Sequence, residues 1–185
     1  RVSHDKNCIK VIFNDNYELK CKYFINACGL NAIDVAKKID GINFDLLPTN
    51  TYAKGSYFKI FKKLPYNNLI YPIPEEGGLG IHLTFDLDGN ARFGPDVEYI
   101  DNLNYEIDLN KKEIFYKTIK KYVDGISSDD LYPDYAGIRP KIYLNGKVYN
   151  DFFISNELIK DNKNIINLMG IESPGLTASL AIAKY

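Results

Sequence analysis

The pattern of apolar and polar positions changes character twice along the chain. Ile9, Val11 and Phe13 alternate with polar residues, which predicts a strand with one buried face. The segment KYFINACG that follows is nearly continuous apolar up to Gly29, as in a strand buried on both faces. Helical spacing then appears in LNAIDVAKKI, so residues 23–40 predict a buried strand, a glycine and a helix, which is α/β architecture.

The middle of the chain is richer in strands. Residues 49–99 contain several short alternating segments, and Asp88-Gly89 between two of them is a strong hairpin signal. The segment DLNKKEIFYKTIKKYV predicts an amphipathic helix. Its expected apolar face consists of Ile114, Phe115, Ile119, Tyr122 and Val123. We therefore expect a mostly antiparallel sheet with one helix.

The end of the chain returns to α/β architecture. AGIRPKIYLNG and DFFISNE predict short strands, with Asn145-Gly146 as a turn, and NIINLMG predicts a buried strand that Gly170 ends. The fold class we expect is therefore α+β with α/β parts. A β-rich domain, residues 46–135, is inserted into a doubly wound domain made of residues 1–45 and 136–185.

Composition narrows the function classes. A net charge of −1 gives no electrostatic reason to expect nucleic acid as a partner. Three cysteines without C-x-x-C spacing argue against a disulfide framework and against zinc, so we expect no metal and a reducing compartment, the cytoplasm. No apolar run reaches the length of a transmembrane helix and no signal peptide is visible, although attachment to the face of the inner membrane stays open.

The closing stretch GIESPGLTASLAIAKY suggests a binding site. Ser173 is a good N-cap, Pro174 fits the first helical position, and Gly175 lets another group approach the free N–H donors. Such a helix start, directly after a buried strand and Gly170, can bind an anion or a carbonyl oxygen. Plain helix capping is the alternative. The turn at Gly29 has the same form and the same two interpretations.

Three kinds of side chain are candidates for chemistry. Arg139 could pair with a substrate carboxylate or form a structural salt bridge. His82 lies in an apolar alternating strand, where a packed histidine is the more frequent interpretation and a general base the functional one. Tyr57 and Tyr71 are on expected strands of the middle domain and could reach a ligand with their hydroxyls.

Several motifs together resemble one family. INACGLNA, KGSYFKI, LIYPIP, LGIHLTFDLDGNARFGPD, AGIRPKI and GIESPGLTASLAIA follow one another as in FAD-dependent oxidoreductases of the D-amino-acid oxidase (DAO) superfamily. The L-2-hydroxyglutarate dehydrogenase-like branch is the most similar, and the resemblance covers nearly the whole chain. It implies a Rossmann-type FAD domain and a β-rich substrate domain.

The resemblance also implies roles for residues. His82 matches a histidine that takes the proton of a substrate hydroxyl, and Arg139 matches an arginine near the flavin and the substrate carboxylate. Tyr57 and Tyr71 are the further substrate-binding candidates. The positions expected to contact FAD are Gly29, Leu30, Gly137, Gly170, Gly175, Leu176 and Thr177. The expected function is oxidation of a small 2-hydroxy acid by hydride transfer to flavin.

One feature of the family is absent. The sequence has no G-x-G-x-x-G fingerprint, so we expect it to be the C-terminal portion of a larger protein whose FAD-binding segment is a partner, in the same or a separate chain. An isolated sheet edge makes self-association a further expectation. The alternatives that stay open are an amino-acid or amine oxidase of the same superfamily and a catalytically inactive remnant that acts as a binding module.

Overall fold

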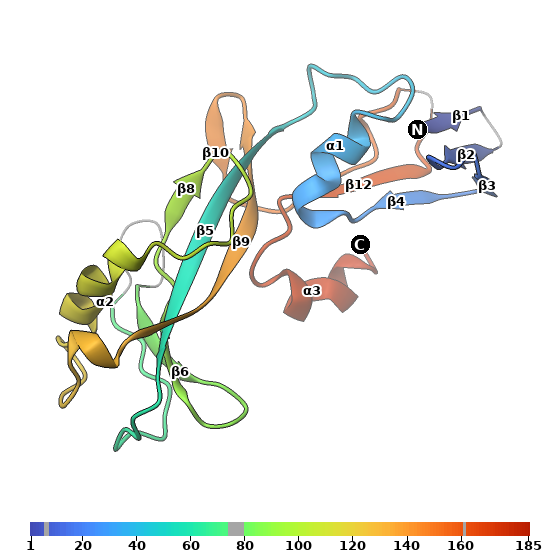
Figure 1. Ribbon diagram of the computed structural model, residues 1–185. Helices are drawn as coiled ribbons and strands as arrows, with labels where there is room; N and C mark the ends of the chain where they lie inside the picture. Colours follow the sequence, from blue (N-terminus) through green and yellow to red (C-terminus); the bar gives the residue numbers. More distant parts are fainter. Residues whose placement is uncertain (6–7, 74–79, 161) are drawn as a thin grey trace. The chain divides into compact units, whose positions relative to one another are not determined.

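The computed structural model describes residues 1–5, 8–73, 80–160 and 162–185 (Figure 1). The chain divides into two compact units. Arg1–Tyr52 and Arg139–Tyr185 together form unit 1, and the continuous segment Ala53–Ile138 forms unit 2. Strands β5 (Thr49–Ile60) and β9 (Tyr132–Leu144) contain the points at which the chain passes from one unit to the other.

Unit 1 contains two small sheets. The first is antiparallel, in the order β1-β2-β3, and the second has the order β11-β12-β4. Their strands are β1 (Val2–His4), β2 (Ile9–Ile12), β3 (Glu18–Cys21), β4 (Phe24–Asn26), β11 (Phe153–Ser155) and β12 (Ile165–Met169). The predicted strand–turn–strand at the start of the chain is confirmed, with Ile9 opposite Cys21 and Ile12 opposite Glu18.

The second sheet joins distant parts of the sequence. Strand β12 is parallel to β4, with Asn167 opposite Asn26, and antiparallel to β11. The 3-10 turn η1 (Gly29–Asn31) and helix α1 (Ala32–Ala36) follow β4. Ala32, Ile33 and Ala36 of α1 are buried in one cluster with Ile165 and Met169 of β12. The predicted strand–glycine–helix segment is therefore present.

One prediction for this sheet is wrong. We expected β4 to be buried on both faces, yet Tyr23 and Ile25 are 64% and 59% exposed. Helix α1 contacts β4. In the described part of the chain, β12 is the only strand that pairs with β4. A nearly continuous apolar run predicts that both faces of a strand are buried. The actual burial depends on which elements pack against the strand, and the run itself does not show this.

Unit 2 is built on an antiparallel sheet. The strand order is β9-β5-β7-β6, and β8 pairs with β5. The remaining elements are β6 (His82–Phe85), β7 (Ala91–Gly94), β8 (Glu98–Ile100), η2 (Leu109–Lys111), α2 (Lys112–Ile119) and η3 (Ser128–Asp130). The predicted hairpin at Asp88-Gly89 is confirmed, since β6 pairs with β7 and Gly89 has φ +82°.

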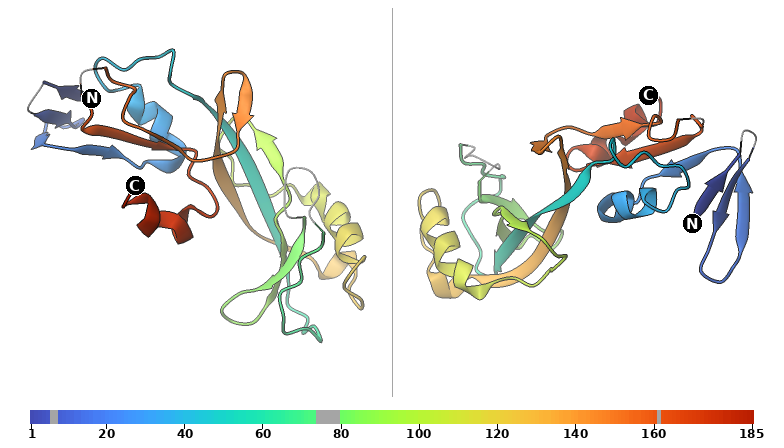
Figure 2. Two further views of the ribbon diagram at one scale, coloured as in Figure 1. Left: turned by 180° about the vertical axis from the view of Figure 1, so that it is seen from behind. Right: turned by 90° about the horizontal axis from the view of Figure 1, so that it is seen from above.

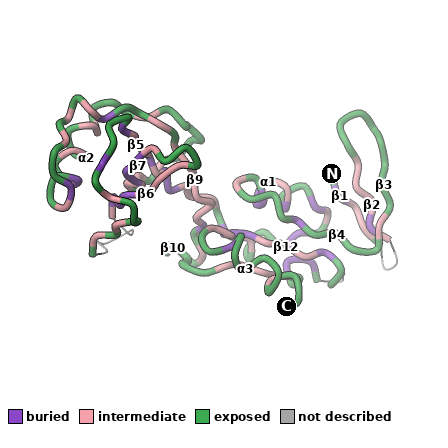
Figure 3. The backbone as a smooth tube through the Cα atoms, turned by 90° about the horizontal axis from the view of Figure 1, so that it is seen from below, coloured by how far each residue is buried: buried purple, intermediate pink, exposed green. Residues whose placement is uncertain are grey.

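Helix α2 covers one face of this sheet (Figure 2). The rings of Phe115 and Phe58 lie 4.7 Å apart, and Ile119 and Val123 are buried in the same cluster. Figure 3 shows buried positions along β5, β6 and β7. The predicted apolar face of α2 was wrong at Ile114, which is 63% exposed, because this residue lies on the side of the helix turned away from the sheet.

In the last part of unit 1, β9 pairs with β10 (Lys147–Tyr149) across the predicted Asn145-Gly146 turn, where both residues have positive φ. Helix α3 (Gly175–Ile182) closes the chain. Among the described residues, no helix is long and apolar enough to cross a membrane.

Candidate functional site

The polar face of the unit 2 sheet carries the histidine predicted as a base. Leu83 and Phe93 point into the core beneath α2, so their neighbours along the strands point to the opposite face. His82 lies on that face, directly opposite Gly94 on the neighbouring strand. Strand alternation and the register of one hairpin therefore place His82 on the sheet face opposite the apolar core beneath α2.

His82 is nonetheless buried. The residue is only 6% exposed. Its ring is stacked on the ring of Tyr71, with centroids 4.3 Å apart and an angle of 15° between the planes. The ring atom Nδ1 lies 3.2 Å from the backbone oxygen of Gly80. When Nδ1 donates a proton to that oxygen, Nε2 carries the lone pair and can accept another proton.

A tyrosine fixes the start of the same strand. The Tyr122 hydroxyl donates a hydrogen bond of 2.7 Å to the backbone oxygen of Ile81, next to His82. Burial raises the pKa of Tyr122 well above its ordinary value. The hydroxyl therefore stays protonated and remains a donor at neutral pH.

Tyr57 extends this face away from His82. Its ring is stacked on that of Tyr135 from β9, with centroids 4.5 Å apart and planes 8° from parallel. The guanidinium carbon of Arg92 lies 5.4 Å from the centre of the Tyr135 ring. The polar face thus carries two stacked ring pairs, Tyr71 on His82 and Tyr57 on Tyr135, and Arg92 lies beside the second pair.

Three charged residues on this face were not predicted from the sequence. Asp134, whose side chain is 8% exposed, pairs with Lys59 at 3.1 Å and with Arg92 at 2.7 Å. Lys59 is two positions from Tyr57 and Arg92 is two positions from Gly94, so strand alternation could have placed each pair on the same sheet face. The approach of Asp134 depends on the pairing of β5 with β9, which the local pattern does not reveal.

In unit 1, the predicted FAD-contacting turn follows β4. Gly29 has φ +55°, and a Cβ added there would meet no atom within 4 Å, so there is open space beside its backbone. The Asn26 side chain is fully buried and donates to the oxygens of Ala32 and of the Asn167 side chain, at 2.7 and 2.9 Å. Leu30 is half-buried within η1.

The second predicted turn follows β12. Gly170 has φ +64°, and α3 begins at Gly175. Our assignment of Ser173 as N-cap and Pro174 as the first helical residue was wrong. Pro174 occupies the cap position, and the helix start has no side-chain cap. The N–H of Gly175 instead bonds to the backbone oxygen of Glu172.

Two donors at this helix start remain available. The N–H of Ala178 bonds to the oxygen of Pro174, but in the described chain no backbone acceptor is recorded for those of Leu176 and Thr177. Both residues are exposed. The helix start therefore offers N–H groups and the positive end of a helix to an electron-rich partner.

Arg139 is held in a salt bridge, which was one of its two predicted interpretations. Its Nη1 lies 3.5 Å from the Glu172 carboxylate, and Lys141 Nζ lies 2.5 Å from the other oxygen of that group. The Arg139 side chain is still 40% exposed, whereas that of Lys141 is 17% exposed. Two cations share one carboxylate here, which leaves a net positive charge close to the start of α3.

The predicted residues are therefore grouped within each unit. Unit 2 holds His82, Tyr57 and Tyr71 on one sheet face, together with Gly137 near its boundary. The other predicted residues, which belong to unit 1, are Gly29, Leu30, Arg139, Gly170, Gly175, Leu176 and Thr177.

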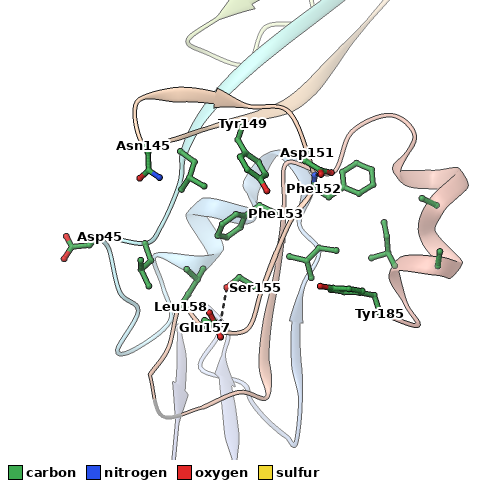
Figure 4. A pocket seen from close by; sticks show the side chains of 16 residues that line it. Asp45, Asn145, Tyr149, Asp151, Phe152, Phe153, Ser155, Glu157, Leu158 and Tyr185 are labelled. Atoms are coloured by element: carbon green, nitrogen blue, oxygen red, sulfur yellow. Dashed lines mark hydrogen bonds between the residues drawn. The ribbon is translucent and has the colours of Figure 1, made fainter.

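Two cavities in unit 1 are lined by almost none of the predicted site residues. A cavity of about 860 Å³ is lined by Tyr149, Phe153 and Tyr185 among others (Figure 4). A second, of about 630 Å³, separates α3 from the apolar sheet face that carries Ile25 and Leu168, and Gly175 is the one predicted residue that lines it. The sheet face beneath α3 is thus largely uncovered within unit 1.

The features of unit 1 fit a dinucleotide cofactor. The N–H groups of Leu176 and Thr177 suit a carbonyl oxygen or partial negative charge, and the space beside Gly29 admits a ligand close to the backbone. The buried atoms Asn26 Oδ1 and Asn167 Nδ2 also lack partners in the described structure. Polar groups at the carboxyl ends of two parallel strands are typical of nucleotide sites.

The comparisons with known proteins agree with this assignment. The family described as "DAO: FAD dependent oxidoreductase" matches residues 2–185. The chain is 42% identical to "L-2-hydroxyglutarate dehydrogenase, mitochondrial" of Arabidopsis thaliana, over 91% of this chain and 37% of that protein. It is 35% identical to "Glycerol 3-phosphate oxidase" of Mycoplasma genitalium, over 90% of this chain and 42% of that protein.

A solved structure has the same fold. L-alpha-glycerophosphate oxidase from Mycoplasma pneumoniae, with FAD bound, superimposes with a TM-score of 0.80 at 24% identity, over 100% of this chain and 47% of that one. The chain thus spans less than half the length of these relatives. Its fold is a β-rich antiparallel domain inserted into part of a Rossmann-type FAD domain, and it belongs to the DAO family of FAD-dependent oxidoreductases.

Proposed function

We propose that this chain is the substrate domain and the C-terminal part of the FAD domain of an enzyme that oxidises a small 2-hydroxy acid similar to L-2-hydroxyglutarate. The observation that carries the proposal is its 42% identity to an L-2-hydroxyglutarate dehydrogenase over 91% of the chain. When bound, FAD supplies the acceptor for the hydride that leaves the substrate carbon.

His82 acts as the general base. Its Nδ1 faces the oxygen of Gly80, so Nε2 is the atom that accepts the proton of the substrate hydroxyl. Tyr71 stacks on the imidazole and restricts its orientation, while Tyr122 holds the preceding carbonyl. Loss of a proton from oxygen and a hydride from carbon converts the hydroxy acid to a 2-oxo acid.

Arg139 pairs with the substrate carboxylate. The cation is 40% exposed and shares Glu172 with Lys141, so its guanidinium keeps donors for a second carboxylate. In unit 1, Leu176 and Thr177 present N–H groups to the flavin, and Gly29, Leu30, Gly170 and Gly175 shape the backbone around it. Gly137 is a further proposed contact, since an added Cβ there would meet no atom within 4 Å.

The partner that completes the cofactor site is a further FAD-binding segment, in the same or a separate chain. Strand β4 has one described neighbour, and Ile25 within β4 is 59% exposed. Leu176 and Leu180 of α3 are 91% and 80% exposed. An added strand and helix would cover this apolar surface, as burial of apolar area requires. Self-association of the uncovered chain is the competing possibility. The three free cysteines are compatible with the cytoplasm.

The test measures flavin reduction in the FAD-loaded full-length protein, with the further FAD-binding segment present, by stopped-flow absorbance with L-2-hydroxyglutarate. His82→Ala is expected to slow reduction about 100- to 10,000-fold while the dissociation constant changes little, because it removes a base and no binding group. Arg139→Ala is expected to weaken binding of the acid. His4→Ala, at the chain's other histidine, is the matched control and should reduce at the normal rate.

Other substrates decide between the alternatives. Glycerol 3-phosphate is the second candidate, because the Mycoplasma genitalium oxidase is 35% identical to this chain. L-glutamate tests amine oxidation, which does not require a base for a hydroxyl. Unchanged reduction in His82→Ala would exclude the histidine as base, and reduction by glutamate alone would exclude hydroxy-acid oxidation.

A further inference from the structure

Two cations on strand β9 hold one carboxylate unequally. Lys141 Nζ lies 2.5 Å from Glu172 Oε1, whereas Arg139 Nη1 lies 3.5 Å from Glu172 Oε2. Glu172 Oε2 is a buried atom that accepts no hydrogen bond from the described part of the chain. The attraction between charges falls with their separation, so Lys141 is the stronger partner of Glu172 and Arg139 the weaker one.

The two cations also differ in their exposure to solvent. The side chains of Lys141 and Glu172 are 17% and 15% exposed, whereas that of Arg139 is 40% exposed. Water and salt screen an ion pair less when it is buried. The pair of Lys141 with Glu172 is therefore the persistent one. The guanidinium of Arg139 has five N–H donors, and its exposed part can bind a further carboxylate.

The backbone around Glu172 is held in place. The Glu172 backbone oxygen accepts a hydrogen bond of 2.5 Å from the N–H of Gly175, at the start of α3. Earlier in the same turn, Gly170 packs so closely against β9 that an added Cβ would lie 3.2 Å from Cδ1 of Ile142. Glu172 therefore stays beside β9. A change in the balance of charge must be met by movement of the longer side chains of β9.

The pairing of Lys141 decides what Arg139 can do. Within the described chain, Lys141 and Arg139 are the cations paired with Glu172, so without Lys141 this carboxylate would have Arg139 alone. An unpaired carboxylate that is largely buried is costly. Arg139 would then close onto both oxygens of Glu172, in the planar arrangement that a guanidinium favours. Its donors would no longer be available to a substrate carboxylate.

Resting on the proposed function, in which Arg139 binds the substrate carboxylate, we propose that Lys141 and Glu172 are positioning residues for Arg139. Lys141 pairs with Glu172 and so prevents this internal carboxylate from competing with the carboxylate of the substrate. The ligand is a small molecule that bears a carboxylate, and the group recognised is the carboxylate itself. A lysine that acts only through its glutamate partner thus sets the affinity of the site for its acid.

A double-mutant cycle on the FAD-loaded full-length protein tests this, with 2-oxoglutarate titrated by calorimetry. This acid has the carboxylates of the proposed substrate but no hydroxyl to oxidise. Lys141→Met is expected to weaken its binding about 10- to 100-fold, the value of a hydrogen bond to a charged group. Glu172→Gln alone should change binding by no more than about twofold, because Arg139 is already available. The double variant should also bind within about twofold of the unaltered protein, because no carboxylate remains to compete.

The cycle separates this competition from a general effect of charge. If each charge acted on the acid independently, Glu172→Gln would tighten binding as much as Lys141→Met weakens it. That result, or binding in the double variant as weak as in Lys141→Met, would overturn the proposal. Lys141→Arg keeps the charge and should bind normally, which covers the case in which the methionine variant folds poorly. The control is Lys163→Met, which removes the lysine of an exposed pair with Glu157 and should leave binding unchanged.

A second measurement needs no substrate. Phenylglyoxal modifies guanidinium groups, and mass spectrometry of the peptide that contains Arg139 gives the rate of its modification. Arg139 should react more slowly in Lys141→Met than in the unaltered protein, and at the normal rate in the double variant with Glu172→Gln. An unchanged rate in Lys141→Met would contradict the capture of Arg139 by Glu172.

The two measurements separate this inference from the proposed reaction. If 2-oxoglutarate does not bind but the modification rates change as expected, the role of Lys141 stands and the proposed substrate is rejected. If L-2-hydroxyglutarate reduces the flavin while neither binding nor modification responds to Lys141→Met, the reaction stands and the role of Lys141 is rejected.

Discussion

Gly94 is the residue on which the polar face of unit 2 most directly depends. It has φ +145°, a conformation that side chains of L-residues rarely adopt, and it lies opposite His82. An added Cβ would be 2.6 Å from the backbone oxygen of Ser56 and 2.7 Å from the Tyr57 ring. The glycine is therefore required both by its backbone conformation and by the close packing above it.

Gly94→Ala is expected to lower the free energy of unfolding by about 2–4 kcal/mol, because backbone strain and a clash with main-chain atoms add together. Gly89→Ala is the matched control. Gly89 also has positive φ, +82°, but an added Cβ would meet nothing within 4 Å. It should cost only the conformational strain, about 1–2 kcal/mol. Urea denaturation followed by circular dichroism measures both, and equal losses would contradict the packing argument.

The candidate residues could be predicted only in part. His82 was identified from its strand pattern, but its position opposite Gly94 depends on the three-residue loop 87–89, which the sequence pattern did not specify. Tyr71 was identified as a strand residue, but its stacking on His82 could not be read from the sequence. Asp134 is separated from Lys59 by more than seventy positions in the numbering, and their ion pair depends on long-range strand pairing.

Among the elements, α2 shows how far a helical pattern can be trusted. Phe115 and Ile119 face the sheet as the spacing predicted, whereas Ile114 next to them faces outward. The pattern placed an apolar residue on the wrong side because the apolar positions of this helix extend around more of its circumference than the sheet covers. Which of these apolar residues contributes to stability depends on its burial, and the sequence pattern alone does not give the burial.

Phe115→Ala should therefore be costly and Ile114→Ala nearly neutral. Phe115 is 1% exposed and its ring packs against Phe58, so we expect its loss to reduce the free energy of unfolding by about 3–5 kcal/mol. For Ile114 the change should stay within about 0.5 kcal/mol. Urea denaturation of the two variants gives the comparison, and a large effect at Ile114 would show that the helix packs through another face.

Turns and strands were predicted with different success. Both predicted turns, the three-residue loop 87–89 that contains Asp88-Gly89 and the two-residue loop Asn145-Gly146, form hairpins because their backbone chemistry is local. Strand β4 was correctly located, but its burial was not. The start of α3 was also misjudged, because Ser173 resembles an N-cap although the chain uses Pro174 at that position. Local chemistry predicted the hairpins, and the errors concern surroundings supplied by other parts of the chain.

At the scale of the whole molecule, the chain consists of one continuous and one discontinuous unit. Unit 2 is the single segment Ala53–Ile138, with its own apolar cluster around Phe58, Leu83 and Phe93. The sheet of unit 1 requires β4 from one end of the chain and β12 from the other. The general plan of an inserted β-rich domain followed from the two changes of pattern along the sequence.

Residues 53–138 expressed alone are therefore expected to unfold in one cooperative transition in urea. In that segment, Phe115→Ala should cost about the same 3–5 kcal/mol as in the full chain, since its contacts lie within unit 2. Residues 1–52 alone should remain largely unfolded, because β4 then lacks β12. A non-cooperative transition for 53–138 would mean that its core needs support from outside the segment.

The parallel pairing of β4 with β12 also has a consequence for biosynthesis. Asn26 and Asn167 meet across 141 positions of sequence, so this contact cannot form until β12 has left the ribosome. Unit 2 emerges in between and can fold first. Its two ends lie on the adjacent strands β5 and β9, so a folded insert replaces a long flexible loop with a short connection. The inserted domain would thus act as an assembly aid that lowers the entropic cost of joining the two segments of unit 1 that flank it.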